Sequence, residues 1–258
     1  MTSAVTALGV DAGMLARLGL GVVLLLLVTA AVLRAGRVRL GWAPFVAVLR
    51  GAVQLAVVGL ALRGVLSAPP TVALALAVMF GTATRTATTR LRGLDRPGRA
   101  VVVACLAGAA VSLGVVFAVG VLPFTSRYVV ALGGIVIGNT MTAATLAGRN
   151  LLAGLRSRRD EVEAWLSLGA TPRQAVADIA RSAAGEALVP ALDQTRTTGL
   201  VTLPGAFIGA LLGGASPVDA ARFQLVVLVA LIAAEAVVAV LVVRLLGAPA
   251  LLPADPEP

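Results

Sequence analysis

Polar residues inside otherwise apolar stretches are the first candidates for chemistry in this sequence. Arg50 and Gln54 are one helical turn apart, and Glu235 lies in the middle of an apolar run. A charge at the centre of a bilayer costs at least about 2.5 kcal/mol on insertion scales, so Arg50 and Glu235 should face protein or water. Two interpretations stay open: the two charges pair as a structural lock, or Arg50 and Gln54 contact a transported solute. The candidates for a translocation pathway are Arg50, Gln54, Asn139, Thr140, Met141, Thr142, Pro204 and Glu235.

Hydrolytic and metal chemistry have little support in the residue types present. The sequence has no histidine and a single cysteine, Cys105, in an apolar run, so no metal ligands are assigned. It also lacks a Gly-x-Ser-x-Gly elbow and a Walker-type glycine loop followed by lysine. We therefore expect that the chain is not an enzyme and binds no cofactor, and that any ATP and Mg²⁺ are used by a partner.

The composition indicates a polytopic, all-α membrane protein. The mean hydropathy is +1.00 and only 13% of the residues are charged, against about a quarter in typical globular domains. On the rule of about 20 apolar residues per span, we expect about seven transmembrane helices in one membrane domain covering residues 1–258. The predicted spans are residues 15–33, 40–62, 70–89, 100–122, 128–148, 197–214 and 217–246.

The distribution of arginine predicts the orientation in the membrane. The net charge of +9 comes from 21 arginines, because the chain has no lysine. The connections after the first, third and fifth predicted spans are richer in arginine than the alternate connections. The positive-inside rule then places the N-terminus outside and the C-terminus in the cytoplasm of the inner (plasma) membrane. Positive charge placed in this way favours contact with anionic membrane lipid and not with nucleic acid.

Residues 149–196 form a polar stretch between apolar runs, with a third of the arginines and half of the acidic residues. We predict a cytoplasmic coupling loop of two short helices, the first over residues 158–168. Residues 171–174, Thr-Pro-Arg-Gln, form a capping box that starts the second helix, and Gly169 ends the first. A protruding pair of helices fits a groove in a soluble partner. The alternative is an interfacial amphipathic hairpin.

The spacing within this stretch partly matches the coupling-loop signature of ABC importer permeases: Glu-Ala-Ala, three residues, Gly, nine residues, Ile-x-Leu-Pro. Glu163 and Ala164 begin the match and Gly169 follows at the required distance. Trp165 replaces the second alanine, and Arg-Ser replaces the closing Leu-Pro. The residues predicted to couple to an ATPase are Glu163, Ala164, Gly169, Ala170, Thr171, Pro172 and Ile179.

Glycines spaced four residues apart predict close packing between helices. Gly205, Gly209 and Gly213 form such a stripe on the predicted sixth span, and Gly134 and Gly138 form one on the fifth. Pro204, also placed in the sixth span, would remove a hydrogen bond from that helix, which indicates a bend or a pathway.

Over nearly its whole length the chain resembles the FetB family. The resemblance is carried by residues 138–142, 168–172, 199–205, 213–217 and 223–224. Members of that family are permease subunits of ABC exporters linked to iron and other metal resistance, and a plant relative is associated with aluminium tolerance. The resemblance implies a homodimer of permeases, driven by a separate ABC ATPase, that exports iron or another metal-linked solute. One departure is residues 206–210, which lack the methionines of the family pattern.

A secondary transporter is the alternative function. In that case Arg50 and Glu235 would form a proton relay for a small solute, without any ATPase. Dependence of transport on an ATPase partner distinguishes the two hypotheses.

Overall fold

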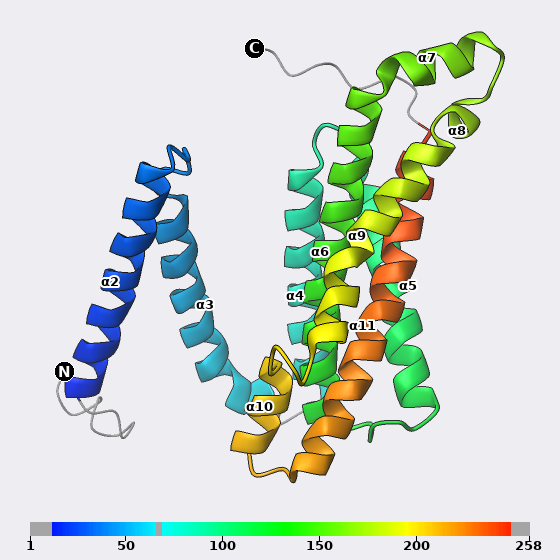
Figure 1. Ribbon diagram of the computed structural model, residues 1–258. Helices are drawn as coiled ribbons and strands as arrows, with labels where there is room; N and C mark the ends of the chain where they lie inside the picture. The colour runs from blue at the N-terminus through cyan, green and yellow to red at the C-terminus, as the bar shows by residue number, and fades with distance from the viewer. Residues whose placement is uncertain (1–11, 66–68, 249–258) are drawn as a thin grey trace. The chain divides into compact units, whose positions relative to one another are not determined.

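The computed structural model describes residues 12–65 and 69–248, and every helix or strand element in that part of the chain is an α-helix (Figure 1). The predicted all-helical class is therefore confirmed. The chain forms two compact units, Met1–Gly64 and Val65–Pro258, and each is described by itself; one membrane domain over residues 1–258 stays a prediction. The helices are α2 (Ala12–Ala35), α3 (Ala43–Val65), α4 (Pro69–Arg90), α5 (Pro97–Ala118), α6 (Ser126–Ser157), α7 (Arg159–Ser167), α8 (Pro172–Ala175), α9 (Ala177–Thr197), α10 (Gly205–Leu212) and α11 (Pro217–Leu246).

The first unit contains α2 and α3, which are mainly apolar on all sides, although α3 also carries Arg50 and Gln54. They are joined by a turn in which Arg37 and Gly41 both have a φ of 53°. Gly13–Ala35 and Ala43–Leu60 are long and apolar enough to cross a membrane. Most of their described side chains are exposed within the unit, as expected of helices that face lipid.

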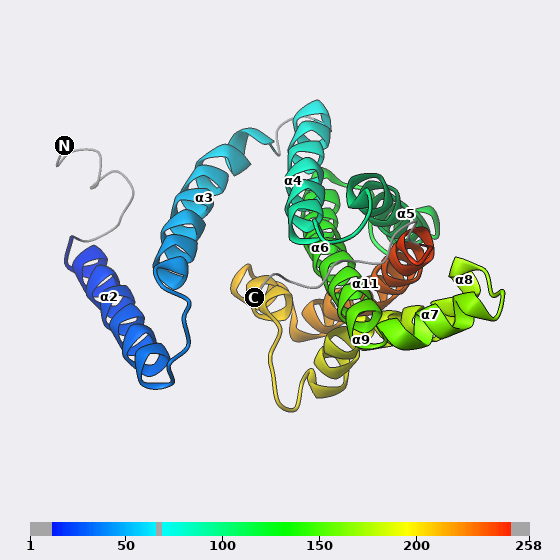
Figure 2. The same cartoon turned by 90° about the horizontal axis from the view of Figure 1, so that it is seen from above.

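The second unit is a bundle built around α6 and α11. Helix α6 contacts α4, α5, α9 and α11, and α11 also contacts α5, α9 and α10 (Figure 2). Most of the residues buried between these helices are small or branched and apolar, which lets the helices pack closely. Fully buried side chains in this core include Leu132, Leu151, Leu155, Val238 and Val242.

Close approach of the bundle helices depends on glycines in α5 and α6. A Cβ atom added at Gly108 of α5 would lie 2.6 Å from the Ala234 carbonyl oxygen of α11. At Gly154 of α6 it would lie 2.5 Å from the Ile179 side chain. A larger residue at either position would therefore push two helices apart.

The glycines predicted to pack have different surroundings. Nothing in the described chain lies within 4 Å of a Cβ added at Gly138, Gly205 or Gly209, and Gly213 meets only carbonyls of its own helix. Gly134 alone has a neighbour from another helix, the Met79 methyl group of α4 at 3.0 Å. The predicted stripe on residues 205–213 is therefore not a packing surface within the described chain, because spacing along one helix does not specify a partner.

Five helices in the described part of the chain are long and apolar enough to span a membrane: α2, α3, α5, α6 and α11. The predicted span at residues 70–89 is the helix α4, but its second half is rich in threonine. The prediction of a sixth span at residues 197–214 is wrong, because α9 ends at Thr197 and α10 has only 8 residues. Gly199 and Gly214, with φ of 88° and 90°, lie in the turns on either side of α10.

Residues 149–196 do not form a loop of two short helices. Their first nine residues continue α6 to Ser157, and their last part belongs to α9, a helix of 21 residues packed on α6 and α11. Hydropathy ended the fifth span too early because Arg149 is charged, although α6 continues by more than two turns. Only α7 and α8 remain as the short helices between two long ones.

Candidate functional site

The α7–α8 elbow, defined here as residues 158–176, is a helix, a turn and a second helix at one end of the second unit. Asp160 and Glu161 lie in the first turn of α7, where the helix dipole favours negative charge. Gly169 has a φ of 87°, and the N–H groups of Gly169 and Ala170 donate to the carbonyls of Leu166 and Trp165. This is a Schellman motif, and it confirms the predicted end of the first helix at Gly169.

A capping box begins the second helix of the elbow. The Thr171 hydroxyl accepts a hydrogen bond from the Gln174 backbone N–H at 3.4 Å, and the Gln174 side-chain oxygen accepts one from the Thr171 N–H at 2.8 Å. Pro172 occupies the first helical position, where its missing N–H is not needed. The predicted capping box is therefore confirmed, and each side of the turn is fixed by bonds within it.

Two ion pairs at the start of α7 join side chains three or four residues apart in the chain. The Arg158 guanidinium donates two hydrogen bonds to the Glu161 carboxylate, at 2.7 and 2.6 Å, and Arg159 donates one to Glu163 at 2.9 Å. The hydrogen bond from Arg158 holds the pKa of Glu161 below its usual range, and the same bond raises the pKa of Arg158. Glu163, predicted to contact an ATPase, thus already has a partner on its own helix.

Buried side chains attach the elbow to the bundle. Val162, Val176 and Ile179 are buried in the same core cluster as residues of α5, α6 and α11. Ile179, the last residue of the predicted signature, is therefore an anchor in the core and not part of an exposed docking surface. The elbow is therefore packed firmly onto the bundle through these side chains.

Two exposed apolar side chains on the elbow were not among the predicted site residues. Trp165 is 50% exposed and Leu168 is 81% exposed, next to the Gly169 turn. Large exposed apolar side chains of this kind are typical anchors of protein–protein interfaces. The signal in the sequence was an aromatic residue within a charged stretch, at the position where the signature has alanine.

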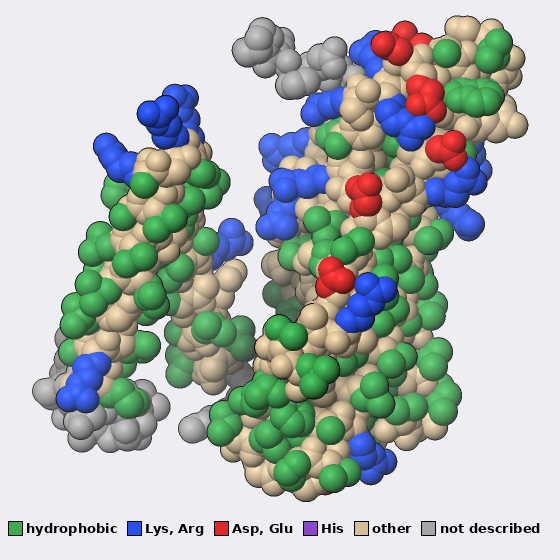
Figure 3. All heavy atoms as spheres, viewed as in Figure 1, with side chains coloured by type: hydrophobic (Ala, Val, Ile, Leu, Met, Phe, Trp, Pro, Cys, Tyr) green, Lys and Arg blue, Asp and Glu red, His purple; other side chains and the backbone are tan. Residues whose placement is uncertain are grey.

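The predicted coupling residues are brought together by the elbow, apart from Ile179. Glu163, Ala164, Gly169, Thr171 and Pro172 are exposed, and Ala170 is half-buried. They lie at one end of the unit, where arginines of α4, α5, α6, α11 and the turn between α4 and α5 also gather (Figure 3). We call this the arginine-rich end; its arginines include Arg90, Arg92, Arg99, Arg149, Arg156 and Arg244.

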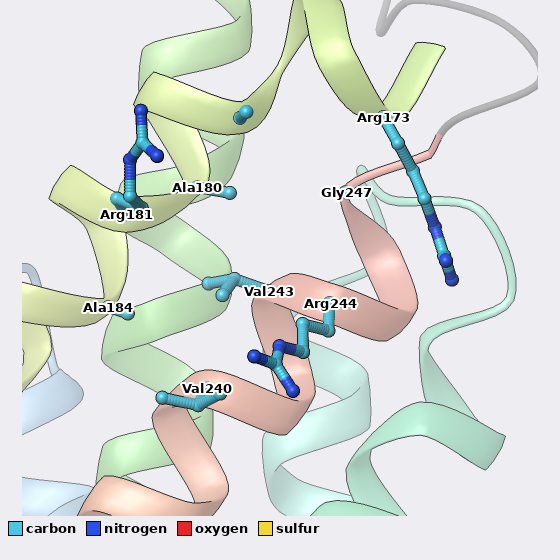
Figure 4. A pocket seen from close by; sticks show the side chains of 9 residues that line it. Arg173, Ala180, Arg181, Ala184, Val240, Val243, Arg244 and Gly247 are labelled. Carbon is cyan, nitrogen blue, oxygen red and sulfur yellow. The ribbon is translucent and has the colours of Figure 1, made fainter. Parts of the chain in front are cut away.

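A pocket of about 520 Å³ lies between the elbow, α9 and the last turn of α11. Arg173, Arg181 and Arg244 line it, around a floor that includes Ala184 and Val240 (Figure 4). Arg181 is also paired with Asp178 on its own helix. The pocket therefore presents positive charge above an apolar floor, directly beside the elbow.

The predicted pathway residues are spread over both units. Arg50 and Gln54 are exposed on α3 in the first unit, whereas Glu235 of α11 is 7% exposed in the second. Glu235 has no hydrogen bond or ion pair within the described residues. Pairing of Arg50 with Glu235 stays a prediction, because the units are described separately.

The polar side chains predicted on α6 donate hydrogen bonds to backbone carbonyls of their own helix. Asn139 donates to the Ile135 carbonyl at 2.8 Å, and the Thr140 hydroxyl donates to Ile137 at 2.8 Å. Thr142, which is exposed, donates to Gly138 at 3.3 Å, and Met141 is half-buried. Asn139, Thr140 and Thr142 therefore each have a hydrogen-bond partner within α6, and a bound ligand is not required to explain their conformations.

Pro204 does not interrupt a helix. It is the residue before α10, and it follows the turn at residues 198–203. The predicted loss of a hydrogen bond inside the sixth span is therefore wrong, because the chain is not helical there. Metal ligands also do not gather: no group of three or more His, Cys, Asp or Glu side chains suited to a metal ion occurs in residues 12–65 and 69–248.

Apolar helices of membrane-spanning length, together with a capped elbow at an arginine-rich end, define a multi-pass membrane protein. The family model described as Uncharacterised protein family (UPF0014) matches residues 15–249. The chain belongs to this family.

Similar proteins carry names that concern membranes and metals. The chain is 37% identical to the UPF0014 membrane protein STAR2 of Oryza sativa over 76% of this chain and 69% of STAR2. It is 34% identical to the protein ALUMINUM SENSITIVE 3 of Arabidopsis thaliana, over 74% of this chain and 70% of that protein. It is 33% identical to the probable iron export permease protein FetB of Escherichia coli, over 69% of this chain and 70% of FetB. No solved structure matches the chain.

Proposed function

We propose that this chain is the membrane-spanning permease subunit of an ABC transporter, driven by ATP hydrolysis with Mg²⁺ in a separate ATPase subunit. The observation that carries the proposal is the α7–α8 elbow, a rigidly capped pair of helices with exposed Trp165 and Leu168 at its turn. The FetB relative, named a probable iron export permease, supports a transport role. The chain itself acts as a permease and not as an enzyme.

Docking of the elbow in a groove of the ATPase explains how closure of the ATPase would move the bundle. Glu163, Ala164 and residues 169–172 form the contact surface, with Trp165 and Leu168 as anchors. Val162, Val176 and Ile179 transmit the displacement, because they are buried in the core shared with α6 and α11. Packed cores shift between discrete arrangements and do not deform continuously, so a push at the elbow becomes a movement of helices.

The arginine-rich end is cytoplasmic in this proposal, as the positive-inside rule requires. About seven spans result when α9 replaces residues 197–214 as the sixth, together with α2, α3, α4, α5, α6 and α11. This order keeps the N-terminus outside and the C-terminus in the cytoplasm of the inner membrane. Two copies of the chain assemble with two ATPase subunits, and the cargo is iron or another metal-linked solute, as the name of the FetB relative indicates.

The variant Gly169→Val tests the coupling assignment. Valine is strained at a φ of 87°, so the turn between α7 and α8 should change while the spans stay intact. We expect loss of transporter-stimulated ATPase activity and of ATPase co-purification, with unchanged abundance in the membrane. The control is Gly114→Val, on an open face of α5 with ordinary φ, which should retain both.

Retention of ATPase co-purification by Gly169→Val would remove the coupling assignment. Unchanged transport in cells without any matching ATPase would instead favour the secondary transporter, with Arg50 and Glu235 as the relay. The two results are separate, because one concerns the elbow and the other concerns the source of energy.

A further inference from the structure

Helix α9 has the length of a membrane span but not the composition of one. Its 21 residues extend over about 31 Å, close to the thickness of the hydrocarbon core. It packs on α6 and α11, both of which are apolar enough to cross a membrane. Figure 1 shows α9 running along these two helices and not across their ends.

The contacts of α9 place its charged residues at the level of the interior of α11. Ala184, the eighth residue of α9, lines a pocket with Val240, and Thr195, near the end of α9, lines a second pocket with Leu228. Asp193 therefore lies level with the part of α11 between Leu228 and Val240, far from both ends of that helix. In Figure 3 the charged side chains continue down over α9 into a zone where hydrophobic side chains dominate.

Five exposed polar residues of α9 lie on one face of the helix, which we call the polar stripe; the exposed Val189 lies among them. The exposed residues Asp178, Ser182, Glu186, Asp193 and Arg196 recur at spacings of three, four and seven, which place them on one face of a helix. The opposite face carries the buried residues Ile179, Ala183, Ala184, Ala187 and Ala191, which pack against the bundle.

The charges of this stripe are only partly paired. Arg196 lies 3.6 Å from Asp193, and both side chains are exposed. Glu186 has no ion pair or hydrogen bond to any residue that the structure describes. Charged side chains facing lipid are costly, so at this level they require water or polar protein.

A cavity of about 480 Å³ lies where α9 ends and supplies a second, independent observation. It is lined by the end of α9, the 198–204 turn, α10 and the first part of α11. Gln224 lines it and is only 5% exposed, yet its side-chain oxygen has no hydrogen-bond partner among the described residues. A buried amide oxygen without a partner is costly, so a water molecule or a solute is expected beside it.

We propose that the polar stripe of α9, with the Gln224 cavity at its end, lines a water-filled pathway for a charged, hydrophilic solute. Glu186 and Asp193 contact the solute along the helix, and Gln224 contacts it at the far end. The passage of a solute along this lining rests on the proposed transport function. The lining itself needs no ATPase, so the two ideas fail separately.

Cysteine accessibility in membranes tests this proposal. The single natural thiol, Cys105, is 1% exposed, and Cys105→Ala supplies a background without thiols. Glu186→Cys and Asp193→Cys are each treated with a small, charged methanethiosulfonate and with a much larger polyethylene glycol maleimide. Two control positions are Asp95→Cys in the exposed turn between α4 and α5 and Val111→Cys on the apolar face of α5. Val111 has the matched depth, because the hydroxyl of its neighbour Ser112 donates to the Ala230 carbonyl of α11 at 2.8 Å.

The expected pattern is full modification of Glu186→Cys and Asp193→Cys by the small reagent and none by the large one. Asp95→Cys should react with both reagents and Val111→Cys with neither. Reaction of Asp193→Cys with both would place α9 outside the membrane and overturn the proposal. Reaction with neither would mean that lipid or protein covers the stripe, which also overturns it. Loss of ATPase co-purification alongside the expected pattern would reject the ABC assignment but not the pathway.

Discussion

Helices α9 and α11 lie side by side, and each is long enough to cross a membrane, with 21 and 30 residues, yet their side chains differ. Helix α11 is apolar along its middle, where its one acid, Glu235, is buried, and its other acid, Asp219, lies in the first turn. Helix α9 is buried on an alanine-rich face and polar on the other, with Glu186 and Asp193 exposed. Hydropathy detects the first kind of helix and misses the second, because it averages over both faces. A span that faces water on one side is therefore found only through its neighbours.

The largest expected effect concerns the packing of α11. Gly108→Leu places a side chain where a Cβ atom alone would lie 2.6 Å from the Ala234 carbonyl oxygen. We expect separation of α5 from α11 and loss of folded protein, with a cost above the roughly 1–3 kcal/mol typical of overpacking. Size-exclusion chromatography and thermal unfolding in detergent measure this. Gly114→Leu, on an open face of the same helix, should behave like the unchanged protein, and equal damage from both would contradict the packing argument.

An intermediate effect is expected on the polar stripe of α9. Asp193→Leu removes a charge that the pathway proposal places in water, so transport should fall on the order of tenfold, equivalent to about 1.4 kcal/mol. Membrane abundance should not change, because an exposed side chain supports no core contact. Transport in vesicles, normalised to protein amount, is the measurement. Val111→Leu at the same depth on α5 should be neutral. Full transport by Asp193→Leu would contradict the proposal that the polar face of α9 contacts the pathway.

The smallest effect is expected for the ion pair between Arg158 and Glu161 at the start of α7. Unlike the pair between Arg196 and Asp193 on α9, it is not part of the proposed pathway. The bond from Arg158 lowers the pKa of Glu161, so its contribution is fully present above the usual carboxyl pKa of about 4.3 and is lost as pH falls through the lowered pKa of the folded protein. Exposed pairs contribute little. Between about pH 6 and pH 8, Glu161→Gln should therefore leave thermal stability and ATPase stimulation unchanged. A clear loss in that range would show that Glu161 contacts the partner directly.

The local features of the candidate site could be predicted from the sequence. The end of α7 at Gly169 and the capping box at Thr171 and Gln174 depend on residues within one turn of each other. Trp165 and Leu168 could not be assigned in this way, because their exposure depends on what the bundle leaves uncovered. Ile179 matched a signature by spacing but is buried against Gly154 of α6, a contact between residues distant in the chain.

The sequence alone determined the helical class, five apolar spans and the break between α7 and α8, since each depends on composition or on hydrogen bonds between near neighbours. Only the tertiary structure decided that α9 and not residues 197–214 lies along α6 and α11, and that Gly108 and not Gly205 allows close packing. The physical reason is that burial depends on partners far away in the chain. The sequence of α9 shows that one face is charged, but it does not identify the helices that pack against the other face.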